Sequence, residues 1–339
     1  MKPPILLPFI ALLILSACAE QANPELNIYS SRKEALIKPV LDQFTAATGI
    51  EVNLVTGKDD ALIERLRAEG AASPADVLIT VDAGRLYRAK AQGLTQAINS
   101  TVVTQAIPAT YRDPDNHWFG LSLRARPIMY AKDRVDPSTL TDYASITAQQ
   151  WQGKVCIRSS SNIYNQSLVA SMIASEGVEA VETWAAGVVN NFARQPVGGD
   201  RDQIKAVAAG QCDLAVANTY YLFGMLQSDD AAEVAAAEQV AVFWPNQADR
   251  GTHVNVSGIA VTKAAKNRDH AQQLLEFLVQ AEAQSWYANA NGEYPVTADI
   301  EAHPLLAAWG DFKKDALNLS RLGELNPEAV KIMDRAGWP

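Results

Sequence analysis

The chain has 339 residues and a formal net charge of −9, with an isoelectric point near 5.0. Such an acidic chain, without a block of lysine or arginine, is not typical of nucleic-acid-binding proteins, and we exclude nucleic acid as a partner. The length is sufficient for two domains of ordinary size.

The N-terminus has the pattern of a secretory signal peptide. A lysine and a short apolar run at residues 5–15 are followed by small residues and then by Cys18. The run is short for a membrane span, although a single anchoring helix is an alternative. Residues 15–18, LSAC, resemble the bacterial lipobox, which implies cleavage before Cys18 and attachment of lipid to it. We therefore expect a signal peptide at 1–17, a lipidated tether at 18–25, and a membrane-anchored lipoprotein of the periplasm or cell envelope.

Two further cysteines, Cys156 and Cys212, lie in the body of the chain. An exported protein meets an oxidising compartment, and we therefore expect a disulfide bond between them. Two buried free thiols are the alternative.

Short apolar strands alternate with helices along the first part of the chain. We expect strands at 26–29, 50–55 and 75–80, and helices that end near residue 47, run from Asp59 or Asp60 to Gly70, and begin at residues 82–84. Pro39 either kinks the first helix or marks a late start for it.

The same alternation returns later in the chain. We expect strands at 154–158 and 213–217, and helices at 165–175, 202–209, 269 to about 290, and 326–336. This order indicates α/β architecture with largely parallel sheets, arranged as two lobes with a cleft between them. The predicted first lobe comprises residues 26–123 and 248–298, and the second comprises 124–247 and 299–339, with crossovers near 104–124 and 247.

Motifs for catalysis or for a histidine metal site are missing from the sequence. The four histidines, His117, His253, His270 and His303, have no ligand spacing, and each is expected to be structural. There is also no nucleophile elbow, Walker loop or dinucleotide fingerprint. We therefore do not expect an enzyme, although a hydrolase on a two-lobe scaffold is one alternative.

Three tyrosines follow two of the predicted strands. Tyr220 and Tyr221 come just after strand 213–217, and Tyr164 comes after strand 154–158. The carboxyl ends of strands in an open α/β sheet are where ligands bind, and at a turn into a helix these hydroxyl groups could converge. An adjacent pair of tyrosines is by itself more often part of a core.

Six stretches make the chain similar to a known family. They are IYSSR (28–32), GKDDALIERLRAEG (57–70), SPADVLITVDAGRLYRA (73–89), SLRARPIMY (122–130), RSSSNIYNQSL (158–168) and ANTYYLFG (217–224). Almost from end to end, the mature chain resembles the bacterial ferric-iron-binding proteins of ABC importers. The resemblance implies a class II periplasmic-binding-protein fold, Fe(III) ligation by Tyr164, Tyr220 and Tyr221, and a monomer that serves an ABC permease and its ATPase.

Iron chemistry is compatible with this ligand set. Fe(III) is a hard cation, and phenolate is a hard anionic donor whose proton, with a pKa of roughly 10, is displaced by the metal. Three oxygens leave an octahedral ion incompletely coordinated. The chain carries Lys33-Glu34 and Val81 where some relatives of this family carry further ligands, so the first lobe lacks its usual donors.

Arginines offer a substitute, because a guanidinium group can hold a small oxyanion with two hydrogen bonds. In a related branch of the family a synergistic anion completes the iron shell, and we expect carbonate held by Arg32, Arg124 and Arg126, with Glu34 as a possible extra ligand. The alternative for the arginines is pairing with acidic neighbours at the lobe interface. The alternative for the cargo is a small organic ligand, such as a polyamine, a phosphonate or an organic anion.

Overall fold

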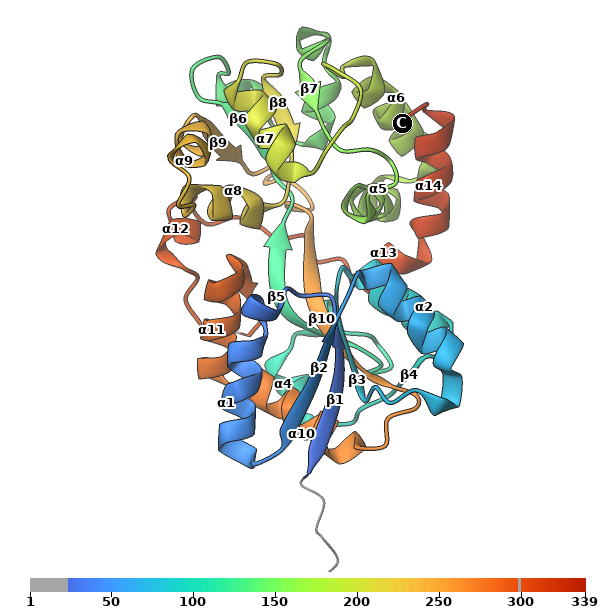
Figure 1. Cartoon of the computed structure of the whole chain (residues 1–339). Coiled ribbons are helices and arrows are strands. Elements are labelled where there is room, and N and C mark those ends of the chain that lie inside the picture. Colours follow the sequence, from blue (N-terminus) through green and yellow to red (C-terminus); the bar gives the residue numbers. More distant parts are fainter. Residues whose placement is uncertain (1–23, 298–299) are drawn as a thin grey trace, which may run out of the picture.

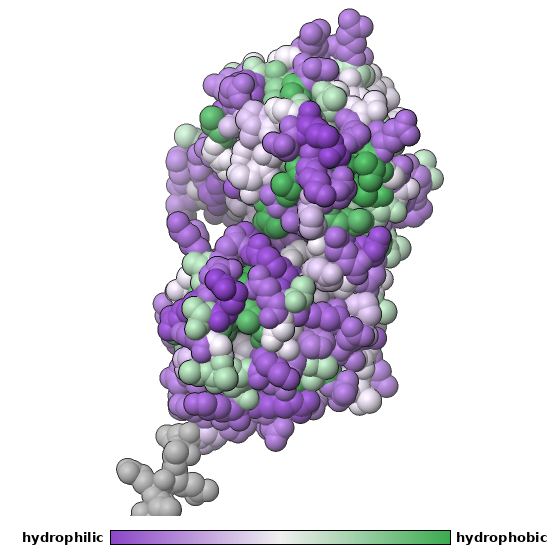
Figure 2. Space-filling view, turned by 90° about the vertical axis from the view of Figure 1, so that its right-hand side faces the viewer, coloured by the Kyte–Doolittle hydropathy of each residue, from purple (hydrophilic) through white to green (hydrophobic). Residues whose placement is uncertain are grey.

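The computed structural model describes residues 24–297 and 300–339 and has two α/β lobes, each built on its own sheet (Figure 1). The predicted signal peptide, lipobox and Cys18 lie outside these residues. Among the residues described, no helix is long and apolar enough to cross a membrane. Seen from the side of α2 and α14, the surface is largely hydrophilic, with small apolar patches on the upper, second lobe (Figure 2).

The sheet of the first lobe has seven strands in the order β11-β5-β10-β3-β1-β2, with β4 paired to β10. They are β1 (Glu25–Ser30), β2 (Glu51–Thr56), β3 (Val77–Val81), β4 (Thr95–Gln96), β5 (Phe119–Ala125), β10 (Val254–Thr262) and β11 (Tyr294–Pro295). As expected, β1 is parallel to β2 and β3, which are joined by helices. In contrast, β10 returns from the other lobe and runs antiparallel to β3 and β5.

The sheet of the second lobe has four strands in the order β7-β8-β6-β9. They are β6 (Ile128–Ala131), β7 (Val155–Cys156), β8 (Leu214–Val216) and β9 (Val240–Phe243). β7 and β8 are parallel, whereas β6 is antiparallel to both β8 and β9. The prediction of largely parallel sheets is therefore wrong, because strands that arrive from the other lobe or pair with such strands run antiparallel. Parallel pairing holds for β1 with β2 and β3, and for β7 with β8, the strands that precede the tyrosines.

Helices cover both sheets. Those of the first lobe are α1 (Lys38–Thr48), α2 (Asp59–Glu69), α3 (Ala83–Ala91), α4 (Thr101–Ala106), α10 (Arg268–Leu278) and α11 (Ala281–Asn291). Those of the second are α5 (Ile163–Glu176), α6 (Val178–Asn190), α7 (Asp200–Ala208), α8 (Thr219–Leu226), α9 (Ala231–Glu238) and α14 (Asn326–Arg335). Two short helices, α12 (Pro304–Ala307) and α13 (Ser320–Glu324), precede α14. Short 3-10 turns occupy Glu34–Leu36, Gly70–Ala72, Ala109–Tyr111, Pro137–Thr139, Tyr143–Thr147 and Gln149–Trp151.

Two details differ from simple periodicity. Pro39 lies in the first turn of α1, where a missing N–H costs nothing, so it marks a late start and not a kink. The predicted helix at 269–290 is two helices, because Gln280 is extended between α10 and α11. The side chain of Gln284 donates from Nε2 to the carbonyl oxygen of Leu278 at 2.9 Å and so satisfies the end of α10.

Two crossover segments connect the lobes, and the two segments lie next to each other. The chain leaves the first sheet after Ala125 and enters the second at Ile128, and it returns between Phe243 and Val254. The backbone N–H of Arg126 donates to the carbonyl oxygen of His253 at 3.1 Å, which fastens one crossover to the other. The lobe boundaries near 123, 247 and 298 stay predictions.

The predicted disulfide is confirmed. Cys156 at the end of β7 is bonded to Cys212, which lies just before β8, with a Cα–Cα distance of 5.9 Å. Both cysteines are buried. The bond therefore fastens the two parallel strands that lead to the tyrosines.

Candidate functional site

The three tyrosines lie in the first turns of two neighbouring helices. Tyr164 is the second residue of α5, and Tyr220 and Tyr221 are the second and third residues of α8. β7 and β8 pair in parallel, so both helices begin at the same edge of the sheet. The ring centroids of Tyr220 and Tyr221 are 4.3 Å apart, and Tyr221 is close enough to Tyr164 and Tyr220 to raise the pKa of both. The structure thus brings the three predicted residues together.

Tyr164 and Tyr220 are neutral in the absence of a cation. Burial raises the pKa of Tyr164 to about 12, with a further increase from the neighbouring Tyr221. Burial likewise raises the pKa of Tyr220 well above 10, with further increases from Tyr164 and Tyr221. The charge of Arg124 opposes both shifts without reversing them. The N-terminal ends of α5 and α8 carry partial positive charge, which favours the phenolate form of the tyrosines there once their protons are displaced.

Arg124 lies beside this cluster and has an unused edge. Its side chain is about 1 % exposed, its Cζ atom lies 5.4 Å from the ring centroid of Tyr164, and its Nη1 atom donates to Oγ of Ser257 at 2.9 Å. The Nε and Nη2 atoms are buried and have no hydrogen-bond partner in the described part of the chain. These two N–H groups point in the same direction and form the edge with which a guanidinium binds an oxyanion in a bidentate manner.

Arg32 is held by an acidic neighbour. Its Nη2 atom lies 2.7 Å from Oε2 of Glu293 and also donates to Ser257, and its Nε atom donates to Oη of Tyr287 at 3.3 Å. Burial would raise the pKa of Glu293, but the charges of Arg32 and Arg124 outweigh it and hold this pKa below its usual range. Arg32 therefore shows the pairing that we considered as the alternative for the arginines.

Arg126 is also engaged by protein groups. Its guanidinium forms an ion pair of 3.0 Å with Asp200 and hydrogen bonds with Asn165 and Asn218. Asn165 follows Tyr164, and Asn218 is the N-cap residue of α8. These contacts tie Arg126 to both tyrosine-bearing helices.

Glu34 lies away from this arrangement. It is exposed in the 3-10 turn Glu34–Leu36, and none of its hydrogen bonds or ion pairs among the described residues involves the tyrosine cluster. Lys33 beside it is also exposed.

Three histidines have the structural roles that we expected. Nδ1 of His117 lies 2.9 Å from Thr95 Oγ1, Nδ1 of His270 lies 3.0 Å from the carbonyl oxygen of Glu25, and Nδ1 of His303 caps α12. Within the described residues, no group of three or more His, Cys, Asp or Glu side chains is arranged to hold a metal ion. Phenol oxygens are therefore the donor set that this site offers.

The fourth histidine belongs to the site, which sequence reasoning missed. His253 lines a small closed space together with Arg124, Arg126, Tyr164, Asn218 and Asn255. Burial and the adjacent arginines lower the pKa of His253 well below its usual range, so its imidazole is neutral. Position in the sequence gave no signal for His253, whereas Asn218 lies inside the ANTYYLFG stretch.

Residues of both lobes meet beside the tyrosines. Asp82 is the N-cap residue of α3 in the first lobe, and its carboxylate accepts hydrogen bonds from Gly84 N, Asn255 Nδ2 and, across the cleft, Ser167 Oγ. Its φ angle of +83° is unusual for a residue other than glycine. The three hydrogen bonds compensate for this strained conformation.

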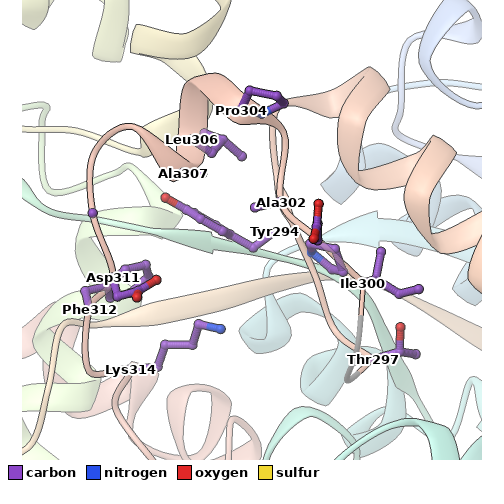
Figure 3. Close-up of a pocket in the computed structure, with 13 residues that line it drawn as sticks. Tyr294, Thr297, Ile300, Ala302, Pro304, Leu306, Ala307, Asp311, Phe312 and Lys314 are labelled. Atoms are coloured by element: carbon purple, nitrogen blue, oxygen red, sulfur yellow. The ribbon is translucent and has the colours of Figure 1, made fainter.

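A larger cavity of about 780 Å³ lies apart from the tyrosine cluster (Figure 3). Tyr294 and Lys314 border it from either side, and Phe312 forms part of its wall. The ring of Phe312 also stacks on Trp244, with centroids 3.9 Å apart. None of the three clustered tyrosines lines this cavity.

Comparisons with known proteins agree with the resemblance. Residues 40–314 match the bacterial extracellular solute-binding protein family. The chain is 50% identical over 335 residues to iron uptake protein A1 of Synechocystis, covering 96% of this chain and 93% of the relative. It is also similar to the Trichodesmium protein IdiA (FutA) solved with iron and citrate, with a TM-score of 0.91, 50% identity, and coverage of 93% of this chain and 100% of the other. Apo FutA2 from Synechocystis gives a TM-score of 0.89 with 44% identity, over 94% of this chain and 100% of the other. The two-lobed periplasmic-binding-protein fold is thereby confirmed, and the chain belongs to the family of bacterial extracellular solute-binding proteins.

Proposed function

We propose that this protein is the substrate-binding component of an ABC importer for ferric iron. Tyr164, Tyr220 and Tyr221 bind Fe(III) as phenolates, and the loaded protein delivers the ion to an inner-membrane permease driven by its ATPase. The observation that supports this most is the convergence of three half-buried tyrosines at one sheet edge. The iron that accompanies the similar Trichodesmium protein supports it further.

Arg124 supplies the anion site in this proposal. Its unpaired Nε and Nη2 atoms hold two oxygens of a carbonate. Oxygen atoms of the same carbonate then coordinate the iron and complete its shell. The neighbouring space is small, which favours a compact anion over a bulky one. Citrate, which accompanies iron in the Trichodesmium structure, is the competing candidate, and it would need the lobes to lie further apart.

The lobes divide the work in binding. Tyrosines on the second lobe take the ion, and Arg124 from the end of β5 brings the anion. Contact between Asp82 and Ser167 then closes the cleft beside Tyr164. Closure excludes water, and the ligand favours it only to the extent that iron binds more tightly to the closed form. We further propose that lipid on Cys18 keeps the monomer at the membrane surface of the periplasm.

The visible spectrum of the mature protein tests the metal. Phenolate bound to Fe(III) absorbs visible light, so a charge-transfer band should appear during titration with Fe(III) and be lost in the Tyr220→Phe/Tyr221→Phe variant. Tyr130→Phe, in β6 of the same lobe, is the matched control and should keep the band. If the unmodified protein shows no band with or without bicarbonate, the ferric proposal is wrong, and the small organic ligand becomes the better candidate.

The same titration tests the anion. Arg124→Lys keeps the positive charge but loses the two parallel N–H donors of the guanidinium. In this variant the band should no longer depend on bicarbonate and should form only at higher iron concentration. A response to bicarbonate identical to that of the unmodified protein would remove Arg124 from the anion site. Replacing bicarbonate by citrate at equal concentration tells the two anions apart.

A further inference from the structure

We infer that Arg126, together with Asp200, is a positioning residue that fixes the relative placement of the three tyrosines, an inference that rests on the proposed function. Arg126 lies in the two-residue passage between β5 and β6 and is 1 % exposed. It does not hold the anion itself. It sets the distance between the starts of α5 and α8, and thereby the shape of the phenolate cluster.

A single guanidinium group connects both tyrosine-bearing helices. Its Nη2 atom donates to Oδ1 of Asn165 at 2.5 Å, and its Nη1 atom donates to Oδ1 of Asn218 at 3.0 Å. Asn165 is the neighbour of Tyr164, and Asn218 lies two residues before Tyr220. A planar group with fixed N–H directions accepts only a narrow range of distances between the two amides.

The two asparagines have little freedom to move. Nδ2 of Asn165 donates to the carbonyl oxygens of Arg158 and Ser159, at 2.7 and 3.1 Å. Nδ2 of Asn218 lies 3.4 Å from Oη of Tyr220. Asn165 and Asn218 are 0 % and 2 % exposed, so a rotated amide would leave buried polar groups unpaired, which is unfavourable.

Asp200 balances the charge of Arg126. Its Oδ2 atom lies 3.0 Å from Nη1 of Arg126 and also accepts from the backbone N–H of Asn218 at 2.9 Å. Both members of the ion pair are almost fully buried. Oδ1 of Asp200 also lies 3.7 Å from Nη1 of Arg158. Removal of Asp200 would leave the buried charge of Arg126 uncompensated, so the ion pair favours one orientation.

Comparison of two arginines separates anchoring from anion binding. In Arg126 the Nη2 atom is taken by Asn165, so the bidentate edge that it would form with Nε is broken. In Arg124 the corresponding Nε and Nη2 atoms are both without a partner among the described residues. The network therefore assigns the anion to Arg124 and the placement of the tyrosines to Arg126.

The anchor is attached to the junction of the lobes. The backbone N–H of Arg126 donates to the carbonyl oxygen of His253, and its carbonyl oxygen accepts from Oη of Tyr143 at 2.8 Å. Oη of Tyr143 in turn accepts from the backbone N–H of His253 at 3.2 Å. The position of Arg126, and with it the placement of the tyrosines, is thus fixed relative to the crossover that connects the lobes.

Spectra of variants at saturating Fe(III) test this inference. Arg126→Lys should shift the phenolate–iron band in wavelength and intensity per bound iron, and iron should dissociate to a competing chelator at least about tenfold faster. Arg134→Lys, which alters an ion pair with Asp213 in the same lobe away from the tyrosines, is the control and should match the unmodified protein. A merely destabilised fold would lower the thermal midpoint of the iron-free protein without moving the band.

A milder variant covers the case in which Arg126→Lys does not fold. Asn165→Ala removes the acceptor of Nη2 and leaves the Arg126–Asp200 ion pair in place. It should also shift the band, and the effects of Arg126→Lys and Asn165→Ala should be less than additive when the variants are combined. An unchanged band and dissociation rate in folded Asn165→Ala, while the unmodified protein shows a normal band, overturns the positioning role alone. Absence of the band from the unmodified protein is instead a failure of the proposed function.

Discussion

Oγ of Ser167 on α5 donates a hydrogen bond of 2.8 Å to Oδ1 of Asp82 at the start of α3, and so joins the second lobe to the first. Ser167 lies one helical turn after Tyr164 and is 0 % exposed, as is Asp82. The carboxylate is oriented by two further donors from its own lobe, so Ser167 meets a prepared acceptor. This hydrogen bond can form only while the lobes are together.

Substitution of Ser167 should therefore weaken closure. A hydrogen bond to a charged group contributes about 1.5–3 kcal/mol, so Ser167→Ala should release iron to a chelator at least about tenfold faster. Ser175→Ala is the matched control, because Ser175 is exposed on the same helix and its hydroxyl donates to carbonyl oxygens of that helix. Stopped-flow measurement of the two variants gives the comparison, and equal release rates would argue against the contact as a closing element.

Gly292 should be required for close approach of the lobes. It ends α11 with a φ angle of +61°, and a Cβ atom placed on it would overlap the ring of Phe223 on α8. In Gly292→Ala the side chain should hold the lobes apart and lower the affinity for iron. Small-angle X-ray scattering of the iron-loaded variant should give a larger radius of gyration than that of the unmodified protein.

The control for this prediction is Gly49→Ala. Gly49 ends α1 with a φ angle of +73°, and the space around it is open. Both substitutions place alanine in a left-handed conformation and should cost about 1 kcal/mol of folding free energy. Only Gly292→Ala should change iron binding, and a similar loss of affinity in Gly49→Ala would show that strain, not contact with Phe223, is responsible.

Iron binding should release protons from the tyrosines. The pKa of Tyr164 is raised to about 12, and that of Tyr220 is raised well above 10, so both phenols carry their protons at pH 7. Fe(III) competes with these protons, and affinity should therefore fall as pH falls, by up to about tenfold per pH unit for each proton displaced. Competition titrations between pH 6 and 8, in steps of about one unit, would measure this dependence.

A pH-stat measurement would count the protons directly. When iron is supplied as its nitrilotriacetate chelate, Tyr221→Phe should release about one proton fewer per bound iron than the unmodified protein. The chelate contributes equally to both reactions and cancels in the difference. Equal proton release would show that Tyr221 is not bound as phenolate.

Removal of the Cys156–Cys212 disulfide should weaken the second lobe more than the site. The bond closes a loop of 56 residues, for which loop entropy predicts a contribution of about 4 kcal/mol to the free energy of unfolding. Denaturant titration of Cys156→Ser/Cys212→Ser should show this loss. The charge-transfer band should persist at 25 °C, because β7 and β8 also pair through their backbones; loss of the band in the folded variant would contradict this.

Local sequence patterns correctly predicted much of the fold and the position of the tyrosines at the ends of two strands. The strands at the start of the chain occur where expected, and the tyrosines follow β7 and β8 because a strand, a short turn and a helix start are all encoded by neighbouring residues. Helix periodicity could not reveal the break at Gln280, since the amide that satisfies the end of α10 comes from Gln284 on the next helix. The disulfide partner of Cys156 could be predicted only because so few cysteines occur.

The roles of the arginines depended on distant partners. Arg32 meets Glu293 across 261 positions of sequence, and Arg126 meets Asp200 across 74. Burial decides which N–H groups remain available, and burial is a property of the folded arrangement. The sequence could therefore predict that arginines surround the site, but not that, of Arg32, Arg124 and Arg126, Arg124 alone keeps both Nε and Nη2 without a partner among the described residues.

All three phenols project from one lobe, and this determines how cargo would be unloaded. In the proposed function, parting of the lobes breaks none of the iron–phenolate bonds; it removes only the cover and the anion donor supplied from β5. The ion would remain bound to the three tyrosines of the second lobe. Opening and unloading are then two separate events, and the second requires an agent that acts on the ion or on its oxygens, such as a proton or an electron. A permease that only pulled the lobes apart would expose the bound iron to solvent but would not take it up.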